Sequence, residues 1–344
     1  MKVIFGGYGM NEFNIPVVLI FFRRKDTILK ILERISKIKP SKIYLISDGP
    51  RNESEKREVL ECREAVEKNI TWNCEVIKNY EKENKGVYDR IGLGAKWVFE
   101  REERAIFLED DNLPELTFFH YCEELLNLYE KDTRILWICG TNYLEEYDPE
   151  DHASYMFTKH LLPCGWASWA YKFNKFYDGE LELLEDGYID TRLKNEYHNK
   201  SLYKQQKHSF LRTKHLLKTN RRSCSWDYQM AFSIRNNGLY GISPCVNQIK
   251  NIGVDEFSEH GGTSLNNIMT KRFCGMDSKT LKFPLKHPKS VLVDYIYEKK
   301  IENIILLPWY YRCGKWIIRF VKPILGLDEF DSFKEWLQRF SIRR

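Results

Sequence analysis

The first half of the chain alternates continuous apolar runs with stretches in which apolar residues recur every three or four positions. The apolar runs are typical of short strands, and the first of them has the unbroken character of a strand buried on both faces. The predicted strands are 16–22, 42–47, 72–77 and 104–108. The predicted helices are 28–35, 53–69 and 87–101. This βαβαβαβ order predicts an α/β fold with a parallel, doubly wound sheet, which binds ligands beyond the carboxyl ends of its strands.

The second half has a weaker periodicity. A helix over 116–129 and a strand over 134–140 continue the alternation, and apolar runs with turn signals return at 239–253. Between these parts the chain is irregular, aromatic and charged. Within it, the segment 164–169 predicts a loop that leads into a helix.

The composition allows a sizeable buried core and excludes several classes of protein. Of the 344 residues, 43% are hydrophobic and 30% are charged, with a net charge of +5. So mild an excess, without zinc-finger spacing or an arginine-rich tract, does not indicate a nucleic-acid partner. The nine cysteines form no CxxC pair, which favours free thiols in a reducing compartment over a disulfide framework. No secretory signal is apparent, and the uncharged run 303–311 is far shorter than the ~20 residues of a spanning helix. We therefore expect a cytoplasmic protein.

Three consecutive carboxylates, Glu109, Asp110 and Asp111, directly follow the predicted strand 104–108. Side chains at that end of a parallel strand face the ligand crevice. A carboxylate there can hold a divalent cation, with phosphate oxygens and waters completing the coordination, and the cation neutralises charge that develops on a diphosphate leaving group. The alternative is a cluster at the N-terminus of the next helix, with Asp111 or Asn112 accepting its free amides.

Seven segments occur in the order seen in GT-A fold glycosyltransferases. They are VVLIFFRRKDT at 17–27, SDGP at 47–50, NKGVYDRIGLGAKW at 84–97, FLEDDNLP at 107–114, CGWASW at 164–169, SWDYQ at 225–229 and NIGVDEFSEHGG at 251–262. Over about 15–265 the chain resembles the N-acetylglucosaminyltransferase I family and its bacterial surface-polysaccharide relatives.

The resemblance implies a GT-A fold, with a Rossmann-like sheet, in a catalytic domain at 1–285. The nucleotide-binding half would cover about 15–140 and the acceptor half about 141–285, followed by a helical, aromatic and basic segment at 286–344. Within the acceptor half, the composition of 183–222 favours a solvated helical insertion, and acceptor-binding loops are the alternative.

The implied activity is a metal-dependent, inverting transfer of a hexosyl or N-acetylhexosaminyl group from a nucleotide sugar, in particular a UDP-sugar. The acceptor would be a glycan or a lipid-linked oligosaccharide in surface polysaccharide synthesis, and Mn²⁺ or Mg²⁺ would be the cofactor. One alternative is a sugar-phosphate nucleotidyltransferase, which is disfavoured because residues 22–25 after the first strand contain no glycine. The other is a catalytically inactive homologue that serves as a membrane-associated scaffold.

The resemblance also implies which residues bind the donor. Arg23 and Asp48 would contact the nucleotide, with Asp48 as an acceptor for the uracil imide. Gly86 and Arg90 would lie near the ribose or the diphosphate. The chain departs from the related bacterial enzymes at Arg24, where they often have proline.

The acidic triplet receives separate roles by the same resemblance. Glu109 would bind the donor sugar, Asp110 the ribose and Asp111 the metal. His260, which precedes two glycines in a polar loop, would lie close to the diphosphate or the metal.

Two aromatic segments complete the predicted site. Asp227 would take the proton of the acceptor hydroxyl, and Trp226 beside it would flank the sugar. The alternative is that Asp227 caps a helix and Trp226 belongs to the core. Gly165 permits close backbone approach to a ligand, and Trp166 would line the donor pocket, with a core position as the alternative.

The tail 291–344 predicts an amphipathic helix bounded by Pro308 and Pro323, and a second short helix over 333–340. Its apolar stripe consists of Ile317, Phe320, Val321 and Ile324, with Trp309, Tyr310, Tyr311 and Trp316 nearby and Arg312, Lys315, Arg319 and Lys322 interleaved. Apolar, aromatic and basic residues in this arrangement suit an anionic membrane interface, which predicts a peripheral position on the inner face of the plasma membrane. Packing on the catalytic domain, or on another subunit of a homo-oligomer, is the alternative.

Overall fold

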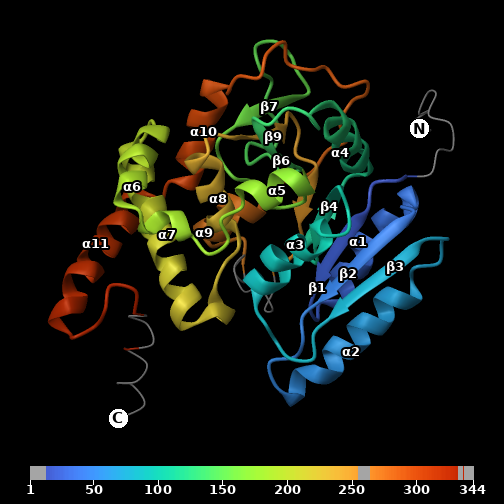
Figure 1. Ribbon diagram of the computed structural model, residues 1–344, viewed down its shortest axis with the longest axis horizontal. Helices are drawn as coiled ribbons and strands as arrows, with labels where there is room; N and C mark the ends of the chain where they lie inside the picture. The colour runs from blue at the N-terminus through green and yellow to red at the C-terminus, as the bar shows by residue number, and fades with distance from the viewer. Residues whose placement is uncertain (1–12, 255–263, 332–335, 337–344) are drawn as a thin grey trace.

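The computed structural model describes residues 13–254, 264–331 and 336. An eight-stranded sheet in the order β3-β2-β1-β4-β8-β6-β9-β7 forms its centre (Figure 1). Only β8 and β7 run opposite to the other strands of this sheet. The predicted α/β class, with a mostly parallel, Rossmann-like sheet and a helical C-terminal segment, is confirmed.

The first half forms the parallel part of the sheet. Its strands are β1 (Val17–Phe21), β2 (Lys42–Ser47), β3 (Glu75–Tyr80) and β4 (Arg104–Glu109). Its helices are α1 (Lys25–Ile38), α2 (Glu53–Lys68), the π-helical turn η1 (Tyr88–Leu93) and α3 (Gly94–Phe99). Because β1 pairs in parallel with both β2 and β4, the carboxyl ends of these three strands lie along one edge.

The second half supplies the remaining strands and most of the helices. The strands are β5 (Asn112–Pro114), β6 (Ile135–Cys139), β7 (Tyr155–Thr158), β8 (Trp166–Trp169), β9 (Tyr240–Pro244) and β10 (Ile249–Asn251). The α-helices are α4 (Leu116–Leu128), α5 (Ala170–Phe176), α6 (Gly187–Leu193), α7 (Lys200–Thr219), α8 (Asp227–Asn236), α9 (Ile268–Cys274), α10 (Tyr295–Ile305) and α11 (Trp309–Ile324). Short 3₁₀ turns are η2 (Glu182–Glu185), η3 (Lys194–Glu196) and η4 (Arg221–Ser223).

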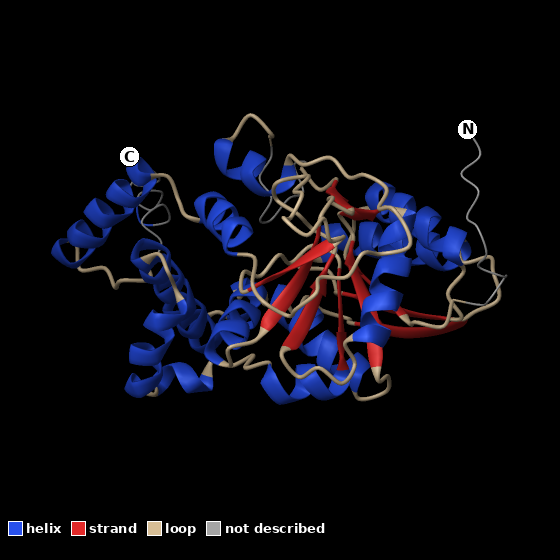
Figure 2. Ribbon diagram, turned by 90° about the horizontal axis from the view of Figure 1, so that it is seen from above, coloured by secondary structure: helices blue, strands red, loops and turns tan. Residues whose placement is uncertain are grey.

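Helices cover both faces of the sheet (Figure 2). Because successive side chains of a strand point to opposite faces, Val17 and Leu19 of β1 pack in the core formed with α1, α2 and α4. Val18 and Ile20 pack in the other core, with α3, α5, α8 and α10. This double covering explains why β1 is apolar without interruption.

Two predicted segments differ in the structure. Residues 166–169 form strand β8 rather than a loop, and β8 lies antiparallel between β4 and β6 in the middle of the sheet. Its four residues are all buried, so the sequence shows no alternation that would mark a strand. The third strand is β3, later than the predicted 72–77, because this edge strand is largely exposed and has a weak apolar pattern.

The basic segment 183–222 is helical, as predicted, but one side of it is buried. Within it, α7 places Leu202 and Phe210 in the core. The tail also begins inside the fold, since Tyr297 and Ile301 of α10 are fully buried. In the part of the chain that the structure describes, none of the nine cysteines forms a disulfide bond. Within the described ranges, no helix has the length and apolar character needed to cross a membrane.

Candidate active site

The acidic triplet lies in a tight turn between two strands. Glu109 ends β4, and Asn112 begins β5, which pairs antiparallel with β10. Helix α4 begins only at Leu116, with Glu115 as its N-cap residue. The alternative interpretation of the triplet as a helix-capping cluster is therefore wrong.

Electrostatics indicate that four carboxylates converge at this edge of the sheet. Burial raises the pKa of Glu109 well above its ordinary value, and the charges of Asp111, Asp110 and Asp227 raise it further. Burial also raises the pKa of Asp111, although the nearby Arg24 charge opposes this shift. The charge of Asp227 therefore acts on the carboxylate that ends β4, and its role as a base stays a prediction.

Arg24, the N-cap residue of α1 in the turn after β1, is a cation within this cluster. Its Nη1 lies 3.5 Å from Oδ1 of Asp110 and 3.6 Å from Oδ2 of Asp111. Its Nη2 donates a 3.4 Å hydrogen bond to the carbonyl of Gly253. Sequence reasoning noted Arg24 only as a departure from related enzymes. The signal that could have found it is the strand order, because a residue after β1 must lie beside one after β4.

Asp110 and Asp111 are also fixed by the backbone around them. The amide of Phe22 donates to Oδ2 of Asp110 at 3.2 Å, and the amide of Ile252 donates to the carbonyl of Asp111 at 2.9 Å. Gly253 lies so close that an added Cβ would stand 2.5 Å from Cβ of Asp111. A larger residue at position 253 would therefore displace Asp111, and the glycine allows the segment after β10 to lie against the triplet.

The chemistry of this cluster fits a divalent cation shared with phosphate oxygens. Carboxylates are the oxygen ligands that Mg²⁺ and Mn²⁺ prefer, and these cations commonly take one or two of them together with substrate phosphates. Among the described residues, no three His, Cys, Asp or Glu side chains form a complete metal cage. The predicted ligand His260 lies outside the described residues.

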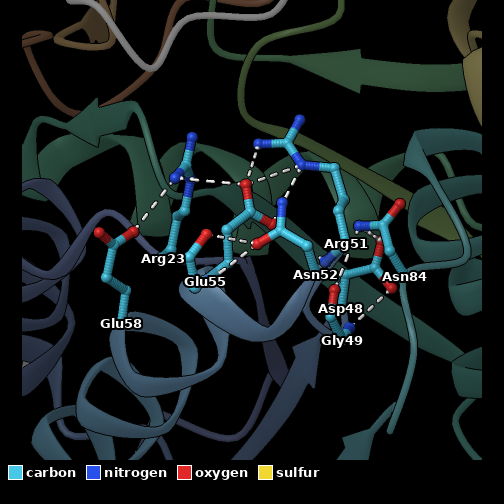
Figure 3. A network of polar contacts seen from close by, with 9 residues as sticks. Arg23, Asp48, Gly49, Arg51, Asn52, Glu55, Glu58 and Asn84 are labelled. Atoms are coloured by element: carbon cyan, nitrogen blue, oxygen red, sulfur yellow. Dashed lines mark hydrogen bonds and ion pairs between the residues drawn. The ribbon is translucent and has the colours of Figure 1, made fainter.

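Asp48, after β2, holds the loop that follows β3 (Figure 3). Its Oδ1 accepts from the amides of Gly49 and Lys85, each at 2.8 Å. Its Oδ2 accepts from Nδ2 of Asn84 at 2.8 Å and from the amide of Gly86 at 3.0 Å. Since a carboxylate has about four acceptor sites, these contacts support a loop-holding role. Contact between Asp48 and a nucleotide base stays a prediction.

Arg23 points toward helix α2, whereas Arg24 points toward the acidic triplet. Its Nη1 lies 3.3 Å from Oε1 of Glu55 and 3.1 Å from Oε2 of Glu58 (Figure 3). Arg51 pairs with the same Glu55 at 2.6 Å. Two consecutive arginines therefore serve different carboxylates, and the predicted contact between Arg23 and the nucleotide stays untested.

Arg90, in η1, is buried beside the end of β3. Its Nη2 donates to the backbone carbonyl and side-chain oxygen of Asn79, at 2.7 and 2.9 Å, and its Nη1 to Glu81 at 3.2 Å. A hollow of about 300 Å³ lies next to it, lined in part by Lys85 and Asp89. Its position between the Asp48-held loop and this hollow is compatible with the predicted nucleotide contact, which stays a prediction.

Gly86 joins the two halves of the chain. Its φ of +90° is one that residues with a side chain rarely adopt, and an added Cβ would stand 2.3 Å from the carbonyl oxygen of Arg222. Arg221 of the same turn pairs with Asp89 at 2.9 Å. These contacts fix η4 on the first half and thereby place the Asp227 segment that follows it.

The tryptophans predicted to line the donor pocket belong to a stack of buried rings. Trp166 lies 3.9 Å from Phe107 and 4.2 Å from Trp137 between ring centroids, and Trp226 lies 5.8 Å from both tryptophans. Trp166 is 1% exposed and Trp226 4%. Their present contacts support the core alternative, and contact with a donor stays a prediction.

Gly165 is required by its surroundings. Its φ is +60°, and an added Cβ would stand 2.5 Å from Ile249 of β10. Its amide donates to Oδ1 of Asn112 at 2.8 Å. The residue therefore fixes β8 against the β5–β10 pair beside the acidic triplet, and a direct donor contact stays a prediction.

Asp227 is the first residue of α8. The hydroxyl of Ser225 and the amide of Tyr228 both donate to its Oδ1, the amide at 3.0 Å. The N-cap residue of α8 is Trp226 and no side chain caps the helix, so the alternative interpretation of Asp227 as the cap is wrong. The contacts of Oδ1 orient the carboxylate of Asp227, and its charge acts on Glu109 across the site.

Comparisons with known proteins give distant structural likenesses. No model of a protein family matches the chain, and no curated protein matches it. One similar solved structure is a mannosyltransferase from Pyrobaculum calidifontis in complex with GDP-Man and Mn²⁺, with 11% identity, a TM-score of 0.33 and coverage of 64% of this chain and 69% of that chain. UDP-glucose pyrophosphorylase complexed with UDP-glucose has 10% identity, a TM-score of 0.32 and coverage of 69% and 91%. The glycosyltransferase GlyE of Streptococcus pneumoniae TIGR4 has 12% identity, a TM-score of 0.28 and coverage of 94% and 66%. These likenesses are too distant to support a family or an activity.

Proposed function

We propose that the chain is a metal-dependent, inverting glycosyltransferase of the GT-A type with a nucleotide-sugar donor, in particular a UDP-sugar. The transferred group is a hexose or an N-acetylhexosamine, and the acceptor is a glycan or a lipid-linked oligosaccharide of a surface polysaccharide. The observation that carries the proposal is the acidic triplet at the carboxyl end of β4, with Arg24 lying against Asp110 and Asp111. The charge of Asp227 acts on Glu109 of the triplet.

An excess of carboxylates at a ligand-binding edge favours a cationic or metal-bound ligand. A divalent cation, Mn²⁺ or Mg²⁺, held by Asp111 supplies the charge that stabilises a departing diphosphate. Arg24 lies between Asp110 and Asp111, so it limits their mutual repulsion and keeps a positive charge beside the diphosphate position. The Phe22 amide orients Asp110, which supports a contact with the ribose.

Asp227 acts as the general base in this proposal. Its carboxylate takes the proton of the acceptor hydroxyl while that oxygen attacks the anomeric carbon, and the bond from this carbon to the diphosphate oxygen breaks. Attack from the side opposite the leaving group inverts the anomeric configuration. Ser225 and the Tyr228 amide hold Oδ1 of Asp227 and so set the direction of the carboxylate.

A panel of nucleotide sugars with Mn²⁺ tests the donor proposal. A true donor should raise the melting temperature in proportion to its affinity and should release nucleoside diphosphate only when metal is present. A nucleotidyltransferase would instead release pyrophosphate from a nucleoside triphosphate and a sugar 1-phosphate. An inactive homologue would show the thermal shift without turnover. A panel in which no nucleotide sugar stabilises the chain would contradict donor binding itself.

The variant Asp227→Asn tests the base. Turnover should fall about 100- to 10,000-fold, while the donor-induced thermal shift stays, because the proton is taken only in the transition state. NMR of the wild-type product should show the inverted anomer. Undiminished turnover in the variant, or a retained anomer, would refute the single-base mechanism.

A further inference from the structure

Helix α11 is amphipathic in the opposite sense to an ordinary surface helix. A surface helix of a globular protein normally turns its apolar stripe to the core. Here the exposed fractions of Trp309, Trp316, Phe320 and Ile324 are 69%, 68%, 68% and 74%. No residue of α11 is buried. Figure 1 shows α11 at the outer edge of the molecule, beside α7.

The exposed apolar side chains form one continuous stripe. At 100° per residue, positions 309, 313, 316, 317, 320 and 324 fall on one side of the helix. An exposed apolar patch of this kind marks an interaction site.

The polar side of α11 is the side that contacts the rest of the chain. Lys322 donates to the carbonyl of Glu329 at 2.7 Å, and Arg319 pairs with the carboxylate of the same residue. That carboxylate lies 3.3 Å from Nδ1 of His208 on α7, and the ring of Phe330 lies against the rings of His208 and His215. The loop after α11 thus ties the helix to α7 by its basic side and leaves the apolar side outward.

The charge of this region selects among partners. Helix α11 carries four basic residues and α7 six, and neither helix contains Asp or Glu. The whole chain has a net charge of only +5, so the remainder is net negative. A second copy that paired its α11 with this one would bring two strongly basic regions together. An anionic surface would meet both the apolar stripe and the positive charge.

We propose that α11 lies flat in the interface of an anionic lipid membrane, with its apolar stripe in the acyl boundary and the catalytic domain on its basic side. Tryptophan and tyrosine at 309–311 and 316 suit the headgroup depth, and each lysine or arginine near the surface adds to the attraction for anionic lipid. Vesicle binding does not depend on sugar transfer, so failure of one proposal leaves the other standing.

Sedimentation of the full chain with vesicles tests the inference. The chain should bind vesicles that contain phosphatidylglycerol at low salt, and at least tenfold more weakly when the vesicles are pure phosphatidylcholine or the salt is high. The double variant Trp316→Glu, Phe320→Glu should bind at least tenfold more weakly than the wild type. Both side chains are exposed, so the variant should fold, which its melting curve checks. Leu60→Glu on α2 is the matched control, since it also places a glutamate at an exposed apolar residue, and it should bind as the wild type does.

Three results would overturn the inference. The first is a full-length chain that stays in the supernatant at low salt, and the second is a double variant that binds like the wild type. The third is a wild-type dimer in sedimentation velocity that the double variant converts to a monomer without any vesicle binding, because the stripe would then be covered by a second copy. Point substitutions are preferable to truncation before Val291, since that cut also removes α10, whose Tyr297 and Ile301 belong to the core.

Discussion

Two clusters of buried or half-buried charge among the described residues differ in how far each is neutralised. At the end of β4, Arg24 is the cation that lies against the acidic triplet and opposes the upward pKa shifts there. Beside the edge strand β7, Glu298 of α10 lies 3.5 Å from Nη2 of Arg235 and 3.4 Å from Nε2 of His160. In the first cluster, negative charges that repel one another outnumber the positive ones. In the second cluster, the carboxylate of Glu298 has both a cationic partner and hydrogen-bond donors.

The second cluster is a structural joint. The Thr158 hydroxyl and the Lys159 amide donate to Oε1 of Glu298, the amide at 2.7 Å. Burial alone would raise the pKa of Glu298, but the charge of Arg235 and these hydrogen bonds oppose this shift, and the pKa is lowered. The cluster thus fixes α10 to β7 and α8 with an ionised carboxylate.

The comparison shows that burial alone does not separate a structural cluster from a functional one. What separates them is whether each charge has an opposite charge and hydrogen bonds to balance it. A buried charge with a matched partner and full hydrogen bonding holds elements together. A group of like charges at the ligand-binding edge costs stability until a ligand neutralises it, which is the expected state of a functional site. Each of the following predictions changes one cluster and measures both stability and activity.

Asp111→Asn should produce the largest effect, and on activity alone. The amide is nearly isosteric with the carboxylate but lacks the charge that holds the metal. A bound metal ion stabilises the transition state by several kcal/mol. We expect turnover to fall by about 1,000-fold, with weaker dependence on Mn²⁺. Because the substitution also removes repulsion with Glu109, the melting temperature should stay or rise. Near-native turnover would remove Asp111 from the metal site.

Glu298→Gln should have the converse effect, on stability rather than on chemistry. The new amide group would turn a donor toward Arg235 and His160, where an acceptor is needed. Breaking a buried pair costs about 3 kcal/mol or more, so the midpoint of urea unfolding should fall clearly. Glu33→Gln on α1, which removes an exposed carboxylate paired with Lys37, is the control and should change nothing measurable. An unchanged midpoint in the Glu298 variant would show that the cluster does not fix α10.

The sequence allowed the first cluster to be predicted and concealed the second. The triplet follows an apolar strand directly, so its position at the sheet edge follows from local pattern. Arg24 was missed because its pairing depends on β1 lying beside β4, and strand order is a tertiary property. Strand β8 was missed for a different reason: its four residues are all buried, so they show no alternation, and they are too few and too mixed to form an apolar run like that of β1.

The second cluster has no local signal at all. Its members come from three distant segments, and no pattern around His160, Arg235 or Glu298 distinguishes them from surface residues. The burial of Trp166 and Trp226 was equally open, because an aromatic residue beside a glycine or an aspartate suits a pocket and a core alike.

The smallest predicted effect is a pH dependence that His160 gives to the second cluster. The guanidinium of Arg235 lies 3.1 Å from Nδ1 of His160. Because a guanidinium can only donate, Nδ1 must accept, and the ring is the neutral Nε2–H tautomer. Burial, assisted by the charge of Arg235, lowers the pKa of His160 to about 4, although Glu298 opposes the shift.

In the unfolded chain the same group titrates near its ordinary value of 6.5. As the pH falls below 6.5, the unfolded state binds a proton that the folded state does not, so the free energy of unfolding decreases until the pH approaches 4. Between pH 6.5 and 5 this loss should be about 2 kcal/mol from His160 alone. Urea midpoints across this range should therefore fall less steeply in His160→Gln than in the wild type, since glutamine does not titrate. If the urea midpoint changed equally steeply with pH in both proteins, His160 would not be held neutral in the folded state. The second cluster would then resemble the first, because it too would contain a charge that lacks a matched partner.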